Sequence, residues 1–236
     1  MQLSKLEYKA YEKLKKNNFV AFKIRDLCLL LEIDKIKAYN LVKSLKKKNA
    51  INKIKNGLFA FSDADEFVLA TAVHYPSYIS FWSALNYYKF TDNLPAKIFI
   101  ATTKYSKEIN NFKYIILSKK RFFGYTKTGE IVIAEKEKAI VDSLLFPRYS
   151  GGIKEIIKCV KSGLKELNIK RLIDYAIKTE SKAVLRRLGF ILENFKYRGR
   201  YIKEIRKKIG KGYELLDPSL NRKNNLNRKW LLDINC

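Results

Sequence analysis

A basic helix followed directly by a tight hairpin, over residues 34–61, constrains the fold of this chain most. Residues 34–49 read DKIKAYNLVKSLKKKN and open with Asp34, a residue type that favours the N-terminal cap of a helix. Residues 50–61 read AINKIKNGLFAF. The Asn56-Gly57 pair is the preferred dipeptide of a two-residue hairpin turn, in which both central residues take a positive φ. The pattern predicts a helix, a turn and two short antiparallel strands in succession.

Two shorter helices are predicted ahead of this unit. Ser4 and Glu7 have the spacing of a capping box at the start of the first helix. Apolar spacing predicts the second helix over Ile24–Leu31, ended by a turn before Asp34. Three helices and then a hairpin are the element order of a winged helix-turn-helix, whose third helix enters the major groove of DNA. We therefore predict a DNA-binding domain of this class over residues 1–62.

The third helix separates core positions from exposed positions. Core spacing assigns four residues to the interior: Ala38, Leu41, Val42 and Leu45. Asn offers a donor and an acceptor that suit adenine, and Lys suits guanine or phosphate. The predicted DNA contacts are Arg25, Lys35, Lys37, Tyr39, Asn40, Lys43, Lys53, Lys55 and Asn56. The alternative is a small helical domain with a solvated lysine face that serves as a protein–protein module.

The charge balance supports a polyanionic partner. The chain has 49 basic and 23 acidic residues, a net charge of +26. Residues 1–62 and residues 182–236 each carry 15 basic and 5 acidic residues, so positive charge is densest at the two ends. Such surfaces attract nucleic acid. A low-GC genome would also enrich Lys, so the excess supports DNA binding only together with the elements above.

The rest of the chain is predicted to form a second, mixed domain over residues 63–236. The acidic, polar stretch Ser62–Glu66 marks the boundary. Strands are predicted over Lys97–Thr102, Phe112–Leu117, Phe122–Tyr125, Ile131–Ala134, Tyr213–Leu216 and Trp230–Ile234. Helices are predicted over Glu66–Val73, Glu135–Phe146, Gly152–Ser162, Ile169–Lys178, Lys182–Phe195 and Tyr201–Ile209, with a turn and an aromatic-rich helix within residues 74–88. The predicted fold class is therefore α+β, a winged helix-turn-helix followed by a mixed domain.

Motifs of catalysis are sparse. His74 is the only histidine, no Gly-x-Ser-x-Gly elbow or phosphate-binding glycine loop occurs, and the three cysteines are far apart. We expect no catalytic residue, no metal site and no cofactor. An odd number of cysteines, no signal-peptide core and no long apolar run predict a cytoplasmic protein that does not bind membranes.

One enzymatic alternative stays open. A nuclease could use Glu135, Glu137 or Asp142 with a metal ion and Lys138. The structural interpretation is simpler, because acidic residues favour the first turn of a helix and Lys138–Asp142 is an ordinary i,i+4 pair.

Five segments stand out in the second half of the sequence: YPSYISFWSALNYY, KIFIATTK, AEKEKAIVDSLLFPRYSGG, RRLGFILE and DPSLNRKNNLNRKWLLDIN. Together they resemble the AbiEi antitoxin family of type IV toxin–antitoxin systems. Their order and spacing carry the resemblance, which covers nearly the whole chain. Lys136 stands where many members of the family have proline.

The resemblance implies a function for each half. The winged helix would bind inverted repeats in its own operator and repress the operon, helped by positive surface on the second domain. The second, antitoxin-like domain would counter a nucleotidyltransferase toxin of an abortive-infection system without a stable complex. The candidate antitoxicity or folding positions are Glu137, Lys138, Asp142, Arg187 and Glu193. The alternative is a winged-helix transcriptional regulator with a ligand- or protein-sensing second domain and no toxin.

Overall fold

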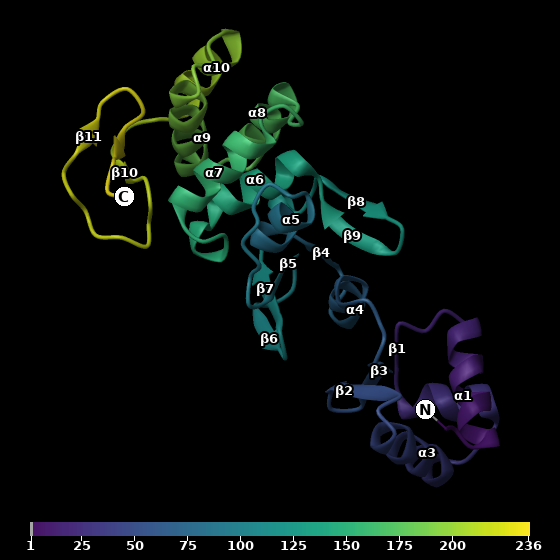
Figure 1. The fold of residues 1–236 in the computed structure, drawn as a ribbon. Coiled ribbons are helices and arrows are strands. Elements are labelled where there is room, and N and C mark those ends of the chain that lie inside the picture. Colours follow the sequence, from purple (N-terminus) through teal and green to yellow (C-terminus); the bar gives the residue numbers. More distant parts are fainter. Residues whose placement is uncertain (1) are drawn as a thin grey trace. The chain divides into compact units, whose positions relative to one another are not determined.

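The chain is an α+β protein that divides into two compact units (Figure 1). The structure is a computed structural model that describes residues 2–236. The first unit runs to Tyr75 and also includes Glu108–Asn110, and the second comprises residues 76–107 and 111–236. The helix that follows Ser62–Glu66 therefore groups with the first unit. That a DNA-binding domain ends at residue 62 stays a prediction.

The first unit consists of helices packed beside a small antiparallel sheet. Its strand order is β1-β3-β2, with Phe22 of β1 and Lys53 of β2 both opposite Phe59 of β3. The strand β1 was not predicted, because two residues are too short for an alternating pattern. The elements are α1 (Lys5–Lys16), β1 (Ala21–Phe22), α2 (Ile24–Leu31), α3 (Lys35–Lys47), β2 (Ile51–Lys55), β3 (Leu58–Phe61) and α4 (Glu66–Val73).

The predicted helix starts are confirmed. Ser4 and Glu7 form a capping box at α1, and the Asp34 carboxylate accepts a hydrogen bond of 2.8 Å from the Lys37 backbone N–H at α3. The four predicted core residues of α3 are buried. They pack in one apolar cluster with Leu14 of α1, Leu27 of α2 and Phe61 of β3.

The hairpin is confirmed, but the predicted turn geometry is wrong. Gly57 has a φ of +73°, whereas Asn56 does not take a positive φ. The pairing register shifts between Lys53 and Lys55, so the strand carries an irregularity just before the turn. An irregularity of this kind bends the strand and increases its local twist, so the turn does not join two regular strands.

Glu7 joins α1 to α3. Its carboxylate accepts hydrogen bonds from the Ser4 backbone N–H at 2.6 Å and the Ser44 hydroxyl at 2.5 Å, and it forms an ion pair with Lys48 at 2.6 Å. Glu7 is only 4% exposed. The Lys48 ammonium, with these hydrogen bonds, lowers the pKa of Glu7 from 4.5 to about 2.

The lowered pKa of Glu7 predicts that the protein loses stability in acid. Because the folded-state pKa is depressed, its stabilisation is present above pH 4.5 and is lost as the pH falls toward 2. We expect Glu7→Gln to cost about 2 kcal/mol at pH 7, allowing for the partial exposure of Lys48, and to cost much less at pH 3. Urea unfolding at both pH values measures this. Glu12→Gln, at an exposed position of the same helix, is the control; an equal loss in both variants would contradict the assignment.

The second unit contains most of a six-stranded mixed sheet and a group of helices (Figure 1). The strands are β4 (Ser77–Ile79), β5 (Ile98–Thr102), β6 (Lys107–Ile109), β7 (Phe112–Ile116), β8 (Tyr125–Thr128) and β9 (Ile131–Ala134), and the helix α5 (Phe81–Tyr87) follows β4. The sheet order is β6-β7-β5-β4-β9-β8, and Glu108 and Ile109 of β6 are grouped with the first unit. The helices that follow are α6 (Lys136–Leu145), α7 (Ile153–Gly163), α8 (Ile169–Lys178), α9 (Lys182–Asn194) and α10 (Arg200–Lys208). A small sheet of β10 (Glu214–Leu215), β12 (Leu232–Asp233) and β11 (Leu226–Asn227) ends the chain.

Two predictions in the second unit are wrong. Residues 77–79, within the stretch 74–88 that was predicted as a turn followed by a helix, form the buried strand β4 between β5 and β9. The predicted strand Phe122–Tyr125 is a loop with Gly124 at a φ of +67°, and the strand begins at Tyr125. The loop conformation places the Phe122 ring against Tyr78, at 4.9 Å between centroids, and the Phe123 ring against Tyr175, at 5.3 Å. Tertiary packing thus overrides the strand propensity of the aromatic residues.

Among the helices of residues 2–236, none combines the length and the hydropathy that a bilayer span requires.

Candidate nucleic-acid interface

The outward face of α3 carries polar and basic side chains over an apolar base. All nine residues predicted to contact DNA are exposed. Asn40 and Lys43 lie on the side of α3 opposite Ala38, Val42 and Leu45, since successive residues of a helix turn by 100°. Tyr39 is 59% exposed and lies toward the hairpin side. The helix therefore presents amide, ammonium and phenol groups to solvent along one surface.

A groove of about 500 Å³ lies between α3 and the β2–β3 hairpin. It brings together three of the predicted residues, Tyr39, Lys43 and Lys53. Two further lysines line it that sequence reasoning missed, Lys46 and Lys47. Their spacing after Tyr39 and Lys43 is helical, which could have identified them. Among the described lining residues there is no acidic side chain, so the groove is positively charged on both sides.

The remaining predicted residues lie outside this groove. Lys55 and Asn56 line a second cleft of about 670 Å³, together with the turn after α1 and the end of α4. There the Lys55 ammonium donates to the Val73 carbonyl oxygen at 3.4 Å. In the first turn of α3, the Lys37 ammonium is 3.6 Å from the Asp34 carboxylate. The structure thus divides the predicted set between the α3 groove, the starts of α2 and α3, the outward face of α3 at Asn40, and the tip of the hairpin.

In the second unit, Lys138 and Asp142 of α6 form a fully buried ion pair. The Asp142 carboxylate also accepts hydrogen bonds from the Tyr78 hydroxyl at 3.0 Å and the Ser80 hydroxyl at 2.8 Å. Burial lowers the pKa of Lys138 while Asp142 opposes the shift, and burial beside Asp142 raises the pKa of Tyr78 well above its usual value. The Lys138 ammonium also lies 4.8 Å from the centre of the Phe123 ring. The pair is closed off from solvent and satisfied by its neighbours.

Glu137 has a different set of contacts on the same helix. Its carboxylate accepts a hydrogen bond of 2.7 Å from the backbone N–H of Asn168, the residue that caps α8. Glu135, the third carboxylate of the nuclease alternative, accepts a hydrogen bond of 2.5 Å from the Tyr175 hydroxyl. Glu135 and Glu137 therefore hold α8 and the residue that caps it. Among the described residues, no group of three or more metal-ligating side chains occurs.

The predicted residues of α9 bind the C-terminal segment, residues 213–236. The Arg187 guanidinium donates to the carbonyl oxygens of Leu216 at 2.9 Å, Leu144 at 2.8 Å and Leu215 at 3.1 Å. The Glu193 carboxylate accepts from the indole N–H of Trp230 at 2.8 Å and pairs with Lys229. Both residues therefore fix the end of the chain against α9.

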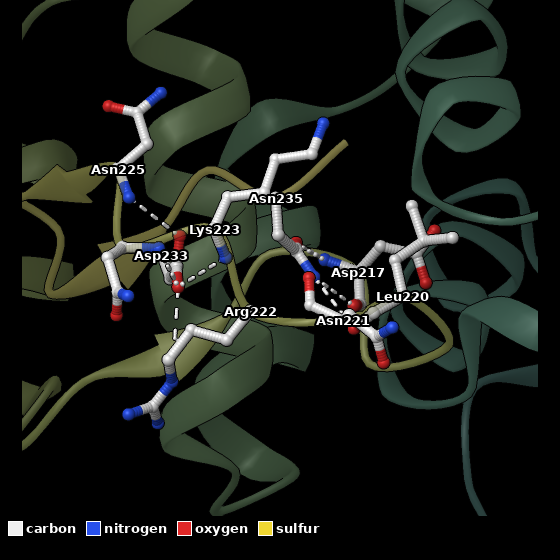
Figure 2. A network of polar contacts seen from close by, with 9 residues as sticks. Asp217, Leu220, Asn221, Arg222, Lys223, Asn225, Asp233 and Asn235 are labelled. Carbon is white, nitrogen blue, oxygen red and sulfur yellow. Dashed lines mark hydrogen bonds and ion pairs between the residues drawn. The ribbon is translucent and has the colours of Figure 1, made fainter.

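The C-terminal segment is itself held by buried polar side chains (Figure 2). The Asp233 carboxylate accepts from the backbone N–H groups of Lys223, Asn224 and Asn225 at 3.0–3.2 Å. The Asn235 amide group is the centre of the second part of the network. It accepts from the Asp217 backbone N–H at 2.9 Å and donates to three carbonyl oxygens, at 2.8 to 3.2 Å. A segment with little regular structure is thus ordered, and its cations face outward.

Comparisons with known proteins concern the fold alone. No family model matches the sequence, and no curated protein matches it. Among solved structures, the chain is similar to the crystal structure of the RV2827C protein from Mycobacterium tuberculosis. The TM-score is 0.71 with 11% sequence identity, and the match covers 98% of this chain and 92% of that chain.

Proposed function

We propose that this chain binds double-stranded DNA through a winged helix-turn-helix in its first unit. The single observation that carries the proposal is the lysine-lined groove between α3 and the β2–β3 hairpin. The element order α1-β1-α2-α3-β2-β3 and the sheet order β1-β3-β2 support it, because a winged helix-turn-helix has its recognition helix and its wing at the positions that α3 and the hairpin take in this order.

The side chains divide the work of binding. Asn40 can hydrogen-bond an adenine edge through its amide, and Lys43 can contact guanine or a phosphate. Lys46, Lys47 and Lys53 neutralise backbone phosphates on the two sides of the groove. Base contacts by α3 then supply specificity, and the lysines supply most of the affinity.

The chain's wider role is proposed to be that of a cytoplasmic autorepressor and antitoxin. The resemblance to the AbiEi family supports this role. It implies that the DNA target is the inverted repeats of the operator, and that the functional partner is a nucleotidyltransferase toxin with which the chain forms no stable complex. No enzymatic activity is proposed. The fully buried Asp142 and the engaged Glu135 and Glu137 disfavour the nuclease alternative.

A transcriptional regulator without a toxin is the second candidate. It shares the first unit and differs in the use of residues 76–236. The reading frame next to this gene distinguishes the two: a nucleotidyltransferase there, whose toxicity in cells falls on co-expression of this chain, supports the antitoxin. Toxicity that stays unchanged at equal toxin levels would favour the regulator.

Variants of α3 test the proposed interface. We expect Asn40→Ala to weaken binding to operator DNA by about 1–3 kcal/mol and to relax the preference for one base pair. Lys43→Ala should reduce affinity and also lower the slope of log affinity against log salt by about one. Mobility-shift titrations at several salt concentrations measure both effects.

A matched variant controls for charge. Lys9 is exposed on α1, and Lys9→Ala removes the same charge as Lys43→Ala at a position away from the α3 groove. We expect it to change operator affinity by less than about twofold, within the effect of screened long-range charge. Equal losses in Lys9→Ala and Lys43→Ala would contradict the assignment of α3.

A further inference from the structure

Ile36 occupies an unusual place on α3. Its side chain is apolar and 75% exposed, whereas its neighbours Lys35 and Lys37 are charged. Ile36, Asn40 and Lys43 are spaced i, i+4 and i+7, so they form one stripe along the side of the helix that faces away from the core. The apolar side chain therefore lies on the same line as the amide and the ammonium that the proposed function places against base edges.

Neither packing nor helix formation accounts for an isoleucine here. Isolated exposed apolar residues are common on protein surfaces, so exposure alone implies nothing. However, a β-branched residue forms helices less readily than Lys or Glu, and Ile36 does not belong to the apolar cluster of the first unit. Ile36 is the second residue after the Asp34 cap, within the turn of a recognition helix that reaches base edges.

We infer that Ile36 is a specificity-determining residue that contacts the C5-methyl group of a thymine in the major groove. The inference rests on the proposed DNA-binding function. Thymine is the base that presents an apolar group in the major groove, and apolar side chains recognise it by contact. The stripe then reads an apolar group through Ile36, a donor–acceptor pair through Asn40, and guanine or phosphate through Lys43.

The test removes the methyl group from the DNA and the side chain from the protein. The probe is the DNA upstream of this gene, narrowed by footprinting to the protected site. Duplexes are then made in which each thymine in turn is replaced by uracil, which keeps the base pair and lacks the methyl. We expect the replacement of one such thymine, in one half-site, to weaken DNA binding by the wild-type chain about fourfold, the value for burying one carbon group.

Matched protein variants, combined with the uracil duplexes, complete a double-mutant cycle. Ile36→Ala should bind the unmodified duplex about as weakly as the wild type binds a duplex in which this thymine is replaced in both half-sites, and it should be insensitive to the replacement. Ile36→Val should keep part of the sensitivity. Leu29→Ala, at an apolar residue of α2 that is 67% exposed, should leave the sensitivity to the uracil replacement unchanged.

The outcomes separate this inference from the function on which it rests. Specific binding without a thymine position whose methyl effect disappears in Ile36→Ala would overturn the inference and leave DNA binding intact. A change in the number of bound copies in Ile36→Ala, with uniform loss across all duplexes, would instead assign Ile36 to a contact between copies and also overturn it. The absence of a protected site would overturn the proposed function itself.

Discussion

Asp142→Asn is expected to lower the free energy of unfolding by about 4 kcal/mol, because it leaves the buried ammonium of Lys138 without a counter-charge. Asparagine still offers an oxygen to the Tyr78 and Ser80 hydroxyls, so the loss reports the charge rather than these hydrogen bonds. Since burial lowers the pKa of Lys138, the variant should regain stability as the pH rises toward 10.5 and Lys138 loses its proton.

Urea unfolding of two further variants makes this prediction specific. Adding Lys138→Met to Asp142→Asn should restore most of the loss, since a buried pair replaced as a whole is often nearly neutral. Glu130→Gln breaks the exposed pair with Lys127 in the same unit and should cost less than about 1 kcal/mol. A double variant as unstable as the single one would show that the charge of Lys138 is not the cause.

Gly189→Ala is expected to destabilise the protein by about 3 kcal/mol, although alanine is the better helix former. A Cβ atom at Gly189 would lie 2.0 Å from Cζ3 and 2.2 Å from Cη2 of the Trp230 ring. Trp230 is fully buried, and its indole N–H is bound by Glu193. The ring therefore cannot move away without losing that hydrogen bond.

A second substitution, at Trp230, tests whether a clash with the indole ring causes the loss of stability. Trp230→Leu alone should destabilise by creating a cavity, and combined with Gly189→Ala it should cost less than the sum of the two single losses. Thermal or urea unfolding of the four chains gives this coupling. Strictly additive losses would contradict a direct clash between position 189 and the indole ring.

These two predictions bear on the candidate antitoxicity positions. Asp142, Lys138, Arg187 and Glu193 hold the second unit together through buried contacts. Loss of toxin protection in a variant at any of them therefore needs a measurement of unfolding beside it. A variant that loses protection while its free energy of unfolding is unchanged would assign that residue a direct role.

The first unit was largely predictable because its signals are local. The Ser4–Glu7 capping box, the Asp34 cap and the core spacing of α3 each depend on residues within a few positions of one another. The hairpin was also local, through Asn56-Gly57. The strand β1 and the detailed turn were missed, because they depend on pairing with β3 and on an irregular register.

The second unit was less predictable because its elements depend on distant partners. The strand β4 is three residues long and takes its conformation from β5 and β9, which are remote in sequence. Lys138 and Asp142 were interpreted as an ordinary helical pair, and their spacing is correct. Their burial could not be read from α6, because residues from β4 and the Phe122–Phe123 loop cover them.

The candidate interface was predictable by residue type and incompletely by position. Tyr39, Lys43 and Lys53 meet at one groove, whereas Lys55 and Asn56 line another cleft. The difference arises from β2. Residues two apart in a regular strand, such as Lys53 and Lys55, share a face, but the register shifts between these two lysines. A sequence pattern without that irregularity would place all the wing lysines on one surface.

A competition mobility-shift titration against the DNA upstream of this gene, at near-physiological salt, tests whether the first unit recognises a specific DNA sequence. We expect a discrete complex that survives an excess of unrelated DNA and weakens in Asn40→Ala and Lys43→Ala but not in Lys9→Ala. Smeared binding that unrelated DNA removes equally well, and that salt abolishes in all variants alike, would show that the net charge of +26 acts only as generic attraction. The proposed winged helix-turn-helix function would then be wrong.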